Sequence, residues 1–204
     1  METLKKIKIV IAFLLISLAG IAQTTTQAAY SKSYESEQAG YYPTAINDLK
    51  SVYSKDNYVV NIRLGWLSYL AKQYTESVKY YNIAIALKPY AIEARFGCIK
   101  PLSAIESWDA VKKHYLQIIK IDPQNTVANY WLGVMYYNGK EYGSAANLFG
   151  RNINLYPLDY ESVIMLAWTK LNLGKQSDAK ILFNQALILR PYDSSALAGL
   201  KQIK

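Results

Sequence analysis

The sequence predicts an all-α fold, a helical-repeat solenoid, from a regular period and from residue types that keep step with it. Prolines recur every 34 residues, at Pro89, Pro123, Pro157 and Pro191. An aromatic residue stands eight residues before each proline and an aliphatic residue two before it. Such a period indicates stacked helix-turn-helix units, each burying its apolar face against its neighbours. The 204-residue chain is 51% hydrophobic, enough for a substantial core.

Columns of residues at fixed distances from the prolines define the expected packing inside each unit. The aromatic column holds Tyr81, Tyr115, Phe149 and Phe183. Twelve residues before the proline, where two helices should approach closely, stand Ser77, Val111, Ala145 and Ala179. Twenty-five residues before it stand Leu64, Cys98, Leu132 and Leu166. Apolar residues at helical spacing form one stripe, so we expect these columns in the core.

The predicted units occupy residues 26–57, 58–91, 92–125, 126–159 and 160–193, followed by a capping helix over 194–204. The first unit is two residues short. Its first helix, expected from Ala28 to about Gln38, is mostly polar, as suits a terminal repeat with one neighbour. In the third unit Pro101 lies inside the first helix, which it should kink or shorten.

The pattern resembles the tetratricopeptide repeat (TPR), a helix-turn-helix unit of 34 residues. The fourth unit carries the resemblance best, with Tyr130, Trp131, Leu132, Gly133, Tyr137, Tyr142, Ala145, Phe149 and Pro157. Asn152 departs from the pattern, because it replaces the usual small apolar residue late in the second helix. The resemblance covers residues 26 to 204 and implies a right-handed solenoid of about five repeats. In this family the first helices line a concave surface that usually binds a protein.

A second stripe on the first helices, about 130° from the packing stripe, would line that concave surface. Its candidate partner-binding residues are Val59, Ile62, Trp66, Tyr69, Phe96, Lys100, Tyr130, Val134, Tyr137, Ile164 and Trp168. A contiguous apolar strip on a surface marks an interaction site, and Trp and Tyr dominate binding energies. The alternative is that some of these rings pack between neighbouring first helices. Lys100 is either a partner for a carboxylate or a solvated lysine.

Several classes of chemistry lack the residues they need. The only nucleophile–base pair would be Cys98 with His114, and Cys98 occupies a packing column. One cysteine cannot build a zinc cage or a disulfide framework, and the glycines form no phosphate-binding loop. We therefore expect no enzymatic activity, no metal and no cofactor. Because the basic residues form no block, nucleic acid is a poor partner.

The N-terminus has the features of a secretory signal peptide over residues 1–22, which leaves a mature chain of 23–204. Three lysines between residues 5 and 8 precede an apolar run that ends near the small residues Gly20 and Ala22. A retained membrane anchor is the alternative. However, 13 apolar residues span about 20 Å, short of the roughly 30 Å hydrocarbon core. We expect a periplasmic or extracellular protein with no membrane span after cleavage.

Two functions remain open. The first is a protein–protein interaction scaffold of the cell envelope or extracytoplasmic space, which binds a protein or peptide segment, alone or in a multi-protein envelope assembly. The second is a glycan-binding module that uses the same rings. Stacking on sugars needs polar partners beside the rings, for which Asn138, Asn172 and Glu161 are the candidates.

We predict that the exported protein begins at Gln23, because the small residues end the apolar run at the usual cleavage spacing. Intact-mass analysis of protein recovered from the periplasm or the medium measures this directly. A product that keeps Met1 and partitions into membranes would contradict the prediction.

Overall fold

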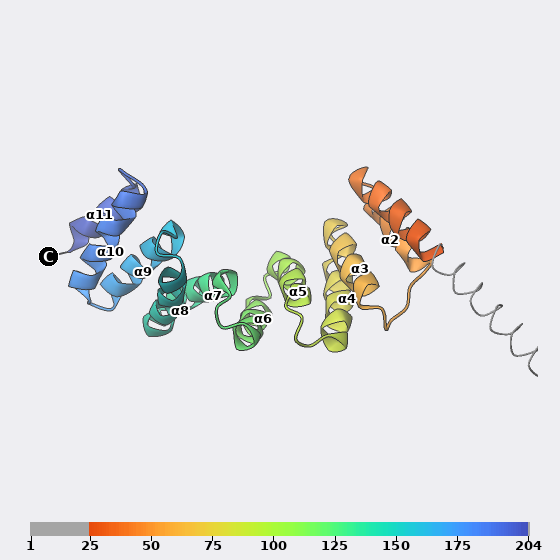
Figure 1. Ribbon diagram of the computed structural model, residues 1–204, viewed down its shortest axis with the longest axis horizontal. Coiled ribbons are helices and arrows are strands. Elements are labelled where there is room, and N and C mark those ends of the chain that lie inside the picture. The colour runs from red at the N-terminus through yellow and green to blue at the C-terminus, as the bar shows by residue number, and fades with distance from the viewer. Residues whose placement is uncertain (1–24, 204) are drawn as a thin grey trace, which may run out of the picture. The chain divides into compact units, whose positions relative to one another are not determined.

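The computed structural model describes residues 25–203, and this part of the chain is all-α (Figure 1). A helix over residues 25–38 precedes the labelled helices. These are α2 (Tyr42–Lys50), α3 (Tyr58–Leu70), α4 (Tyr74–Leu87), α5 (Glu93–Ala104), α6 (Trp108–Ile121), α7 (Thr126–Asn138), α8 (Tyr142–Leu155), α9 (Tyr160–Asn172), α10 (Gln176–Leu189) and α11 (Ser194–Gln202). The predicted helical-repeat fold is confirmed.

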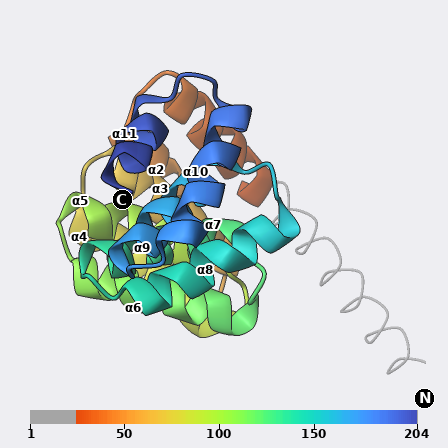
Figure 2. The same ribbon diagram turned by 90° about the vertical axis from the view of Figure 1, so that its left-hand side faces the viewer.

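The chain divides into two compact units, the first ending at Glu106 and the second beginning at Ser107. In the first unit α3 packs against α2, α4 and α5, and α4 also packs against α5. In the second unit each helix from α6 to α10 packs against the next one, and α11 contacts both α9 and α10. Figures 1 and 2 both show α9 beside α10. Within each unit the helices therefore stack on sequence neighbours, as repeat proteins do.

The first helix of several repeats starts at the same kind of cap. A side-chain oxygen accepts a hydrogen bond from the backbone N–H three residues further on, which satisfies an otherwise unpaired donor. The capping residues are Asn57, Asn125 and Asp193. The turn between the two helices of a repeat contains one residue with positive φ, and these are Gly40, Lys72, Glu106, Lys140 and Gly174. The local structure thus repeats with the sequence period.

The packing columns form the core, as predicted. Phe149 and Phe183 are fully buried, and Tyr81 and Cys98 are buried as well. The rings pack directly on neighbouring helix backbones. A Cβ atom added at Gly97 would lie 2.2 Å from the ring of Tyr81. Such a distance is possible only without a side chain, so glycine is required at this contact.

Two local expectations are refined by the structure. The helix over 25–38 is not simply a solvated polar helix, because Ser33 is fully buried and donates to the carbonyl of Ala45 (2.9 Å). Helix α5 continues through Pro101 to Ala104 and has 12 residues, one fewer than α3. Pro101 therefore does not end the helix. The predicted signal peptide, residues 1–22, lies outside the described residues. Across residues 25–203, no helix has the length and apolar character needed to cross a bilayer.

We predict that Gly133→Ala destabilises the protein by about 1–3 kcal/mol through overpacking. A Cβ at Gly133 would lie 2.8 Å from Cε1 of the buried Phe149 ring. The matched control is Gly150→Ala on α8, where a Cβ meets nothing within 4 Å. This control should stabilise the helix by about 0.5–1 kcal/mol. Urea unfolding followed by circular dichroism measures both, and effects of the same sign would contradict the packing described here.

Candidate functional site

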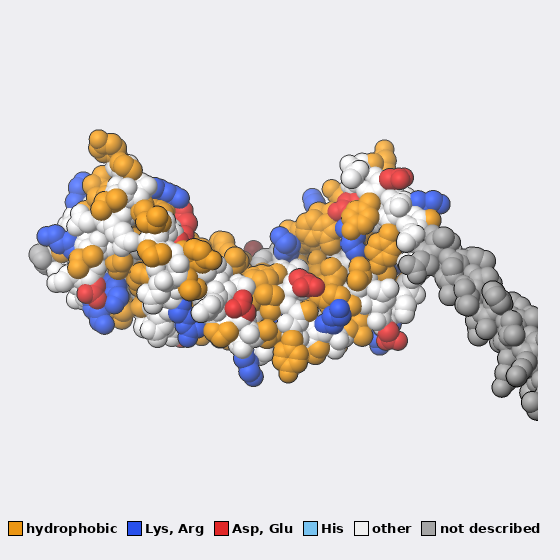
Figure 3. Space-filling model, viewed as in Figure 1, with side chains coloured by type: hydrophobic (Ala, Val, Ile, Leu, Met, Phe, Trp, Pro, Cys, Tyr) orange, Lys and Arg blue, Asp and Glu red, His pale blue; other side chains and the backbone are white. Residues whose placement is uncertain are grey.

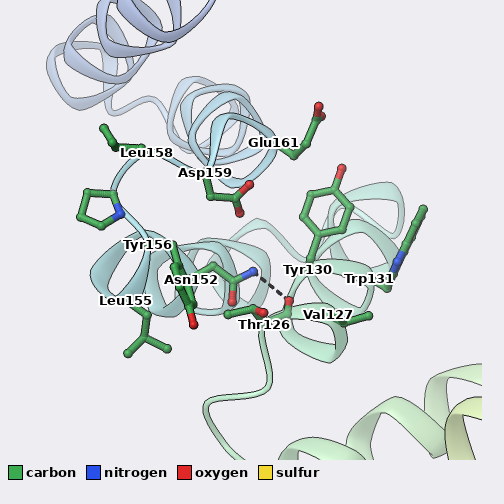
Figure 4. A pocket seen from close by; sticks show the side chains of 11 residues that line it. Thr126, Val127, Tyr130, Trp131, Asn152, Leu155, Tyr156, Leu158, Asp159 and Glu161 are labelled. Carbon is green, nitrogen blue, oxygen red and sulfur yellow. Dashed lines mark hydrogen bonds between the residues drawn. The ribbon is translucent and has the colours of Figure 1, made fainter.

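An open, mainly apolar pocket lies in the second unit, where the start of α7, the end of α8 and the start of α9 meet (Figure 4). Its volume is about 720 Å³, a size typical of ligand sites. The pocket is lined by Thr126, Val127, Tyr130, Trp131, Asn152, Leu155, Tyr156, Pro157, Leu158, Asp159 and Glu161.

The walls of the pocket are apolar side chains that remain exposed. Val127 and Trp131 lie one turn apart on α7, while Leu155 ends α8. Tyr156 and Leu158 belong to the loop before α9 and are 61% and 77% exposed. At the place of Tyr156 the other repeats carry charged residues, Lys88, Asp122 and Arg190. Exposed apolar side chains gathered around a depression mark a binding site.

Asn152 forms the polar floor of the pocket. Its side chain is 1% exposed, and Nδ2 donates to the carbonyl of Thr126 (2.9 Å) and to Oγ of Ser162 (3.1 Å). Figure 4 shows Asn152 between the side chains of Tyr156 and Thr126. Its Oδ1 is buried and has no hydrogen-bond partner within the described residues. It is the amide atom that remains for a ligand.

Two carboxylates stand on one side of the pocket. Glu161 forms an ion pair with Arg190 (2.8 Å). Asp159 precedes α9 without capping it, and its side chain has no ion pair among residues 25–203. Figure 4 shows its carboxylate directed toward the space between Tyr130 and Asn152. Burial raises the pKa of Tyr130, and the nearby negative charges of Glu161 and Asp159 raise it further.

In the first unit, three predicted strip residues come together. The rings of Trp66 and Tyr69 lie 5.8 Å apart, and Nζ of Lys100 lies 5.8 Å from the Trp66 ring. Trp66 also donates from Nε1 to Glu37 (2.6 Å), which forms an ion pair with Arg63. Trp66 therefore ties the first repeat to the second. Of the remaining strip residues, Val59 is exposed, and those partly buried are Ile62 and Phe96.

In the second unit, most strip residues make contacts between repeats. Trp168 donates from Nε1 to Oγ of Ser195 (2.8 Å), and its ring packs edge-on against Phe183. Tyr137 accepts a hydrogen bond from Asn172 (3.1 Å). Tyr130 lines the pocket. Ile164 is buried in the core and offers no surface, whereas Val134 is partly buried.

The groups considered for catalysis are not arranged for it. Burial raises the pKa of the Cys98 thiol to about 12, so the thiolate does not form at neutral pH. His114 lies on α6, partly buried. Among the described residues, no three His, Cys, Asp or Glu side chains are grouped closely enough to hold a metal ion.

The pocket was not predicted from the sequence, although part of its signal was visible. Asn152 breaks an apolar column, and Ser162 breaks another one, in which the other repeats carry Ala94, Ala128 and Ala196. These two departures lie on consecutive helices and meet in space. The exposed loop from Tyr156 to Asp159 carries no periodic signal, because its side chains belong to no helix face.

No protein-family model and no curated protein matches the sequence. Solved structures do match. A crystal structure of MamA aligns with a TM-score of 0.69 at 18% identity, covering 81% of this chain and 91% of MamA. A tetratricopeptide repeat protein from Parabacteroides merdae ATCC 43184 aligns with a TM-score of 0.73 at 17% identity, covering 86% of this chain and 71% of that protein. The chain has the TPR fold. At these identities the likeness concerns the fold alone.

We predict that Trp66→Phe lowers the free energy of unfolding by about 1.5–3 kcal/mol, because it removes a hydrogen bond to the carboxylate of Glu37. Trp108→Phe is the matched control, since Trp108 is 54% exposed. Thermal unfolding followed by circular dichroism compares the two. Equal melting temperatures would mean that the indole of Trp66 contributes nothing to joining the first two repeats.

Proposed function

We propose that this protein is an exported, non-enzymatic interaction scaffold that binds a segment of a partner protein, with the α7–α9 pocket as its main docking point. The observation that carries the proposal is the exposure of the pocket walls. Five large apolar side chains around one depression face solvent, namely Val127, Trp131, Leu155, Tyr156 and Leu158. Their burial under a partner would release the water that now covers them.

Further exposed apolar side chains favour a protein partner over a small molecule. Figure 3 shows hydrophobic side chains interspersed with charged ones on the surface of both units. The predicted strip adds partly exposed rings, including Trp66 and Tyr69 in the first unit and Tyr137 in the second. Aromatic rings of this kind are frequent hot spots of protein interfaces. The strip remains a predicted secondary contact, because several of its rings also join repeats.

A peptide suits the site better than a glycan. Sugar binding needs free polar groups beside the stacking ring, and two of the three candidates are engaged. The amide of Asn172 donates to Tyr137 and to the carbonyl of Trp168, and Glu161 is paired with Arg190. The apolar pocket walls accept aliphatic or aromatic side chains without such partners.

Export is the part of the proposal that rests on the sequence. The lysines, the apolar run and the small residues at its end follow the order of a secretory signal. We place the mature chain in the periplasm or outside the cell, where its partner would be another envelope or extracellular protein.

We predict that Trp131→Ala and Leu158→Ala each weaken peptide binding by about 1–4 kcal/mol, the range of aromatic and aliphatic hot spots. Both side chains are exposed, at 49% and 77%, so the melting temperature should hardly change. Binding is measured with immobilised hexapeptides in a positional-scanning library. The control is Ile188→Ala, an 80% exposed residue outside the pocket lining.

The same variants are applied to an array of soluble envelope glycans. Selective peptide capture that is lost in both pocket variants and kept in the control supports the scaffold. Glycan capture without peptide capture would favour the sugar-binding alternative. Peptide capture that all three variants retain would remove the pocket from the proposal.

A further inference from the structure

The floor of the pocket departs from the repeat pattern at two neighbouring positions. Five residues before the proline the repeats carry Ala84, Ile118, Asn152 and Ala186. Five residues after it they carry Ala94, Ala128, Ser162 and Ala196. Only the junction of the fourth and fifth repeats has a polar residue in both columns. Asn152 and Ser162 are buried and hydrogen-bonded to each other.

The fold does not need this polar pair. Alanine fills the same two places at the next junction, at Ala186 and Ala196, and both are fully buried there. The pair also leaves Oδ1 of Asn152 buried and unpaired, which costs about 1–3 kcal/mol in a folded protein. A donor supplied by a ligand would recover this loss.

Asp159 departs from the repeat pattern in a related way. At the equivalent places Asn125 and Asp193 use their side chains to cap the following helix. The backbone N–H of Ala196 is the main cause that lowers the pKa of Asp193. Asp159 does not cap α9, and Figure 4 shows its carboxylate directed into the pocket. Its charge is therefore available to a ligand.

The polar groups of the pocket consequently share one character. Asn152 offers an acceptor, Asp159 offers an unpaired carboxylate, and the lining contains no Lys or Arg. This holds although the whole chain carries a formal net charge of +8. A site with acceptors and negative charge among apolar walls is complementary to a cation with N–H donors attached to an apolar stem.

We propose that the pocket binds a lysine or arginine side chain that stands beside an apolar residue in the partner segment. This inference rests on the proposed scaffold function. The cation pairs with Asp159 and donates to Oδ1 of Asn152, while the apolar neighbour packs on Trp131 and Leu158. The side chain of Tyr156 lies beside Asn152, is 61% exposed and makes no hydrogen bond or ring contact with the described residues. Its rotation opens the floor to the entering donor.

The hexapeptide library described above tests the inference with the full-length mature protein. We expect it to select Lys or Arg at one position next to an aliphatic or aromatic residue. The best lysine peptide should bind at least tenfold more weakly when its lysine is acetylated. Asp159→Asn should cause a similar loss for the lysine peptide and little for the acetylated one. Asp193→Asn is the matched control, since its carboxylate caps α11, and it should leave peptide binding unchanged.

The double variant Asn152→Ala/Ser162→Ala separates a binding role from a structural one. It reproduces the residues of the next junction, so its melting temperature should equal or exceed that of the wild type. Its affinity for the lysine peptide should fall at least tenfold. A lower melting temperature with unchanged affinity would show that the polar pair serves the fold, and would overturn the inference.

Other outcomes distinguish this inference from the scaffold proposal. Selection of apolar peptides without a basic residue, still lost in Trp131→Ala, would overturn the inference and leave the scaffold standing. Capture of glycans alone would overturn both. A dimer seen by light scattering and dissolved by Trp131→Ala would place a second copy of the chain in the pocket and overturn the proposed occupant.

Discussion

Stacking in this protein depends on the contact between one aromatic ring in each second helix and the bare backbone of neighbouring first helices. The ring of Tyr81 lies between Gly65 of its own repeat and Gly97 of the next, where added Cβ atoms would approach to 3.0 and 2.2 Å. The rings of Phe149 and Phe183 approach Gly133 and Gly199 in the same way. Because one ring touches two helices, it fixes the helix pair and the stacking on the next repeat together.

The same constraint accounts for the main wall of the pocket. Gly97 and Gly199 stand at one place of the repeat, and in the fourth repeat that place holds Trp131. An indole cannot enter a contact that excludes a Cβ, so the side chain turns outward. Trp131 is 49% exposed, and its ring packs edge-on against Tyr130 at 5.3 Å. A single bulky residue in a packing column thus converts a core position into part of a binding surface.

The sequence predicted what depends on neighbours within one period and missed what depends on partners further away. The helix pairs and the buried ring column follow from the spacing of 34, and the burial of Cys98 follows from its column. The strip residues share one helical face, yet Val59 is exposed and Ile164 is buried. Helix periodicity gives the direction of a side chain but not what covers it. The bond from Trp66 to Glu37 joins residues 29 apart on different helices, which no single-helix pattern contains.

The polar floor and the apolar walls of the pocket belong to one compromise between stability and binding. Where the columns hold Ala186 and Ala196, the junction is closed by apolar packing alone. At Asn152 and Ser162 the chain gives up part of that packing, and next to them it leaves Asp159 uncapping and Trp131 outside the core. Each departure is unfavourable for folding, and all of them meet at one depression. Local rules are broken together where a surface serves binding rather than stability, and the regular junctions on either side supply the rigidity that the site itself lacks.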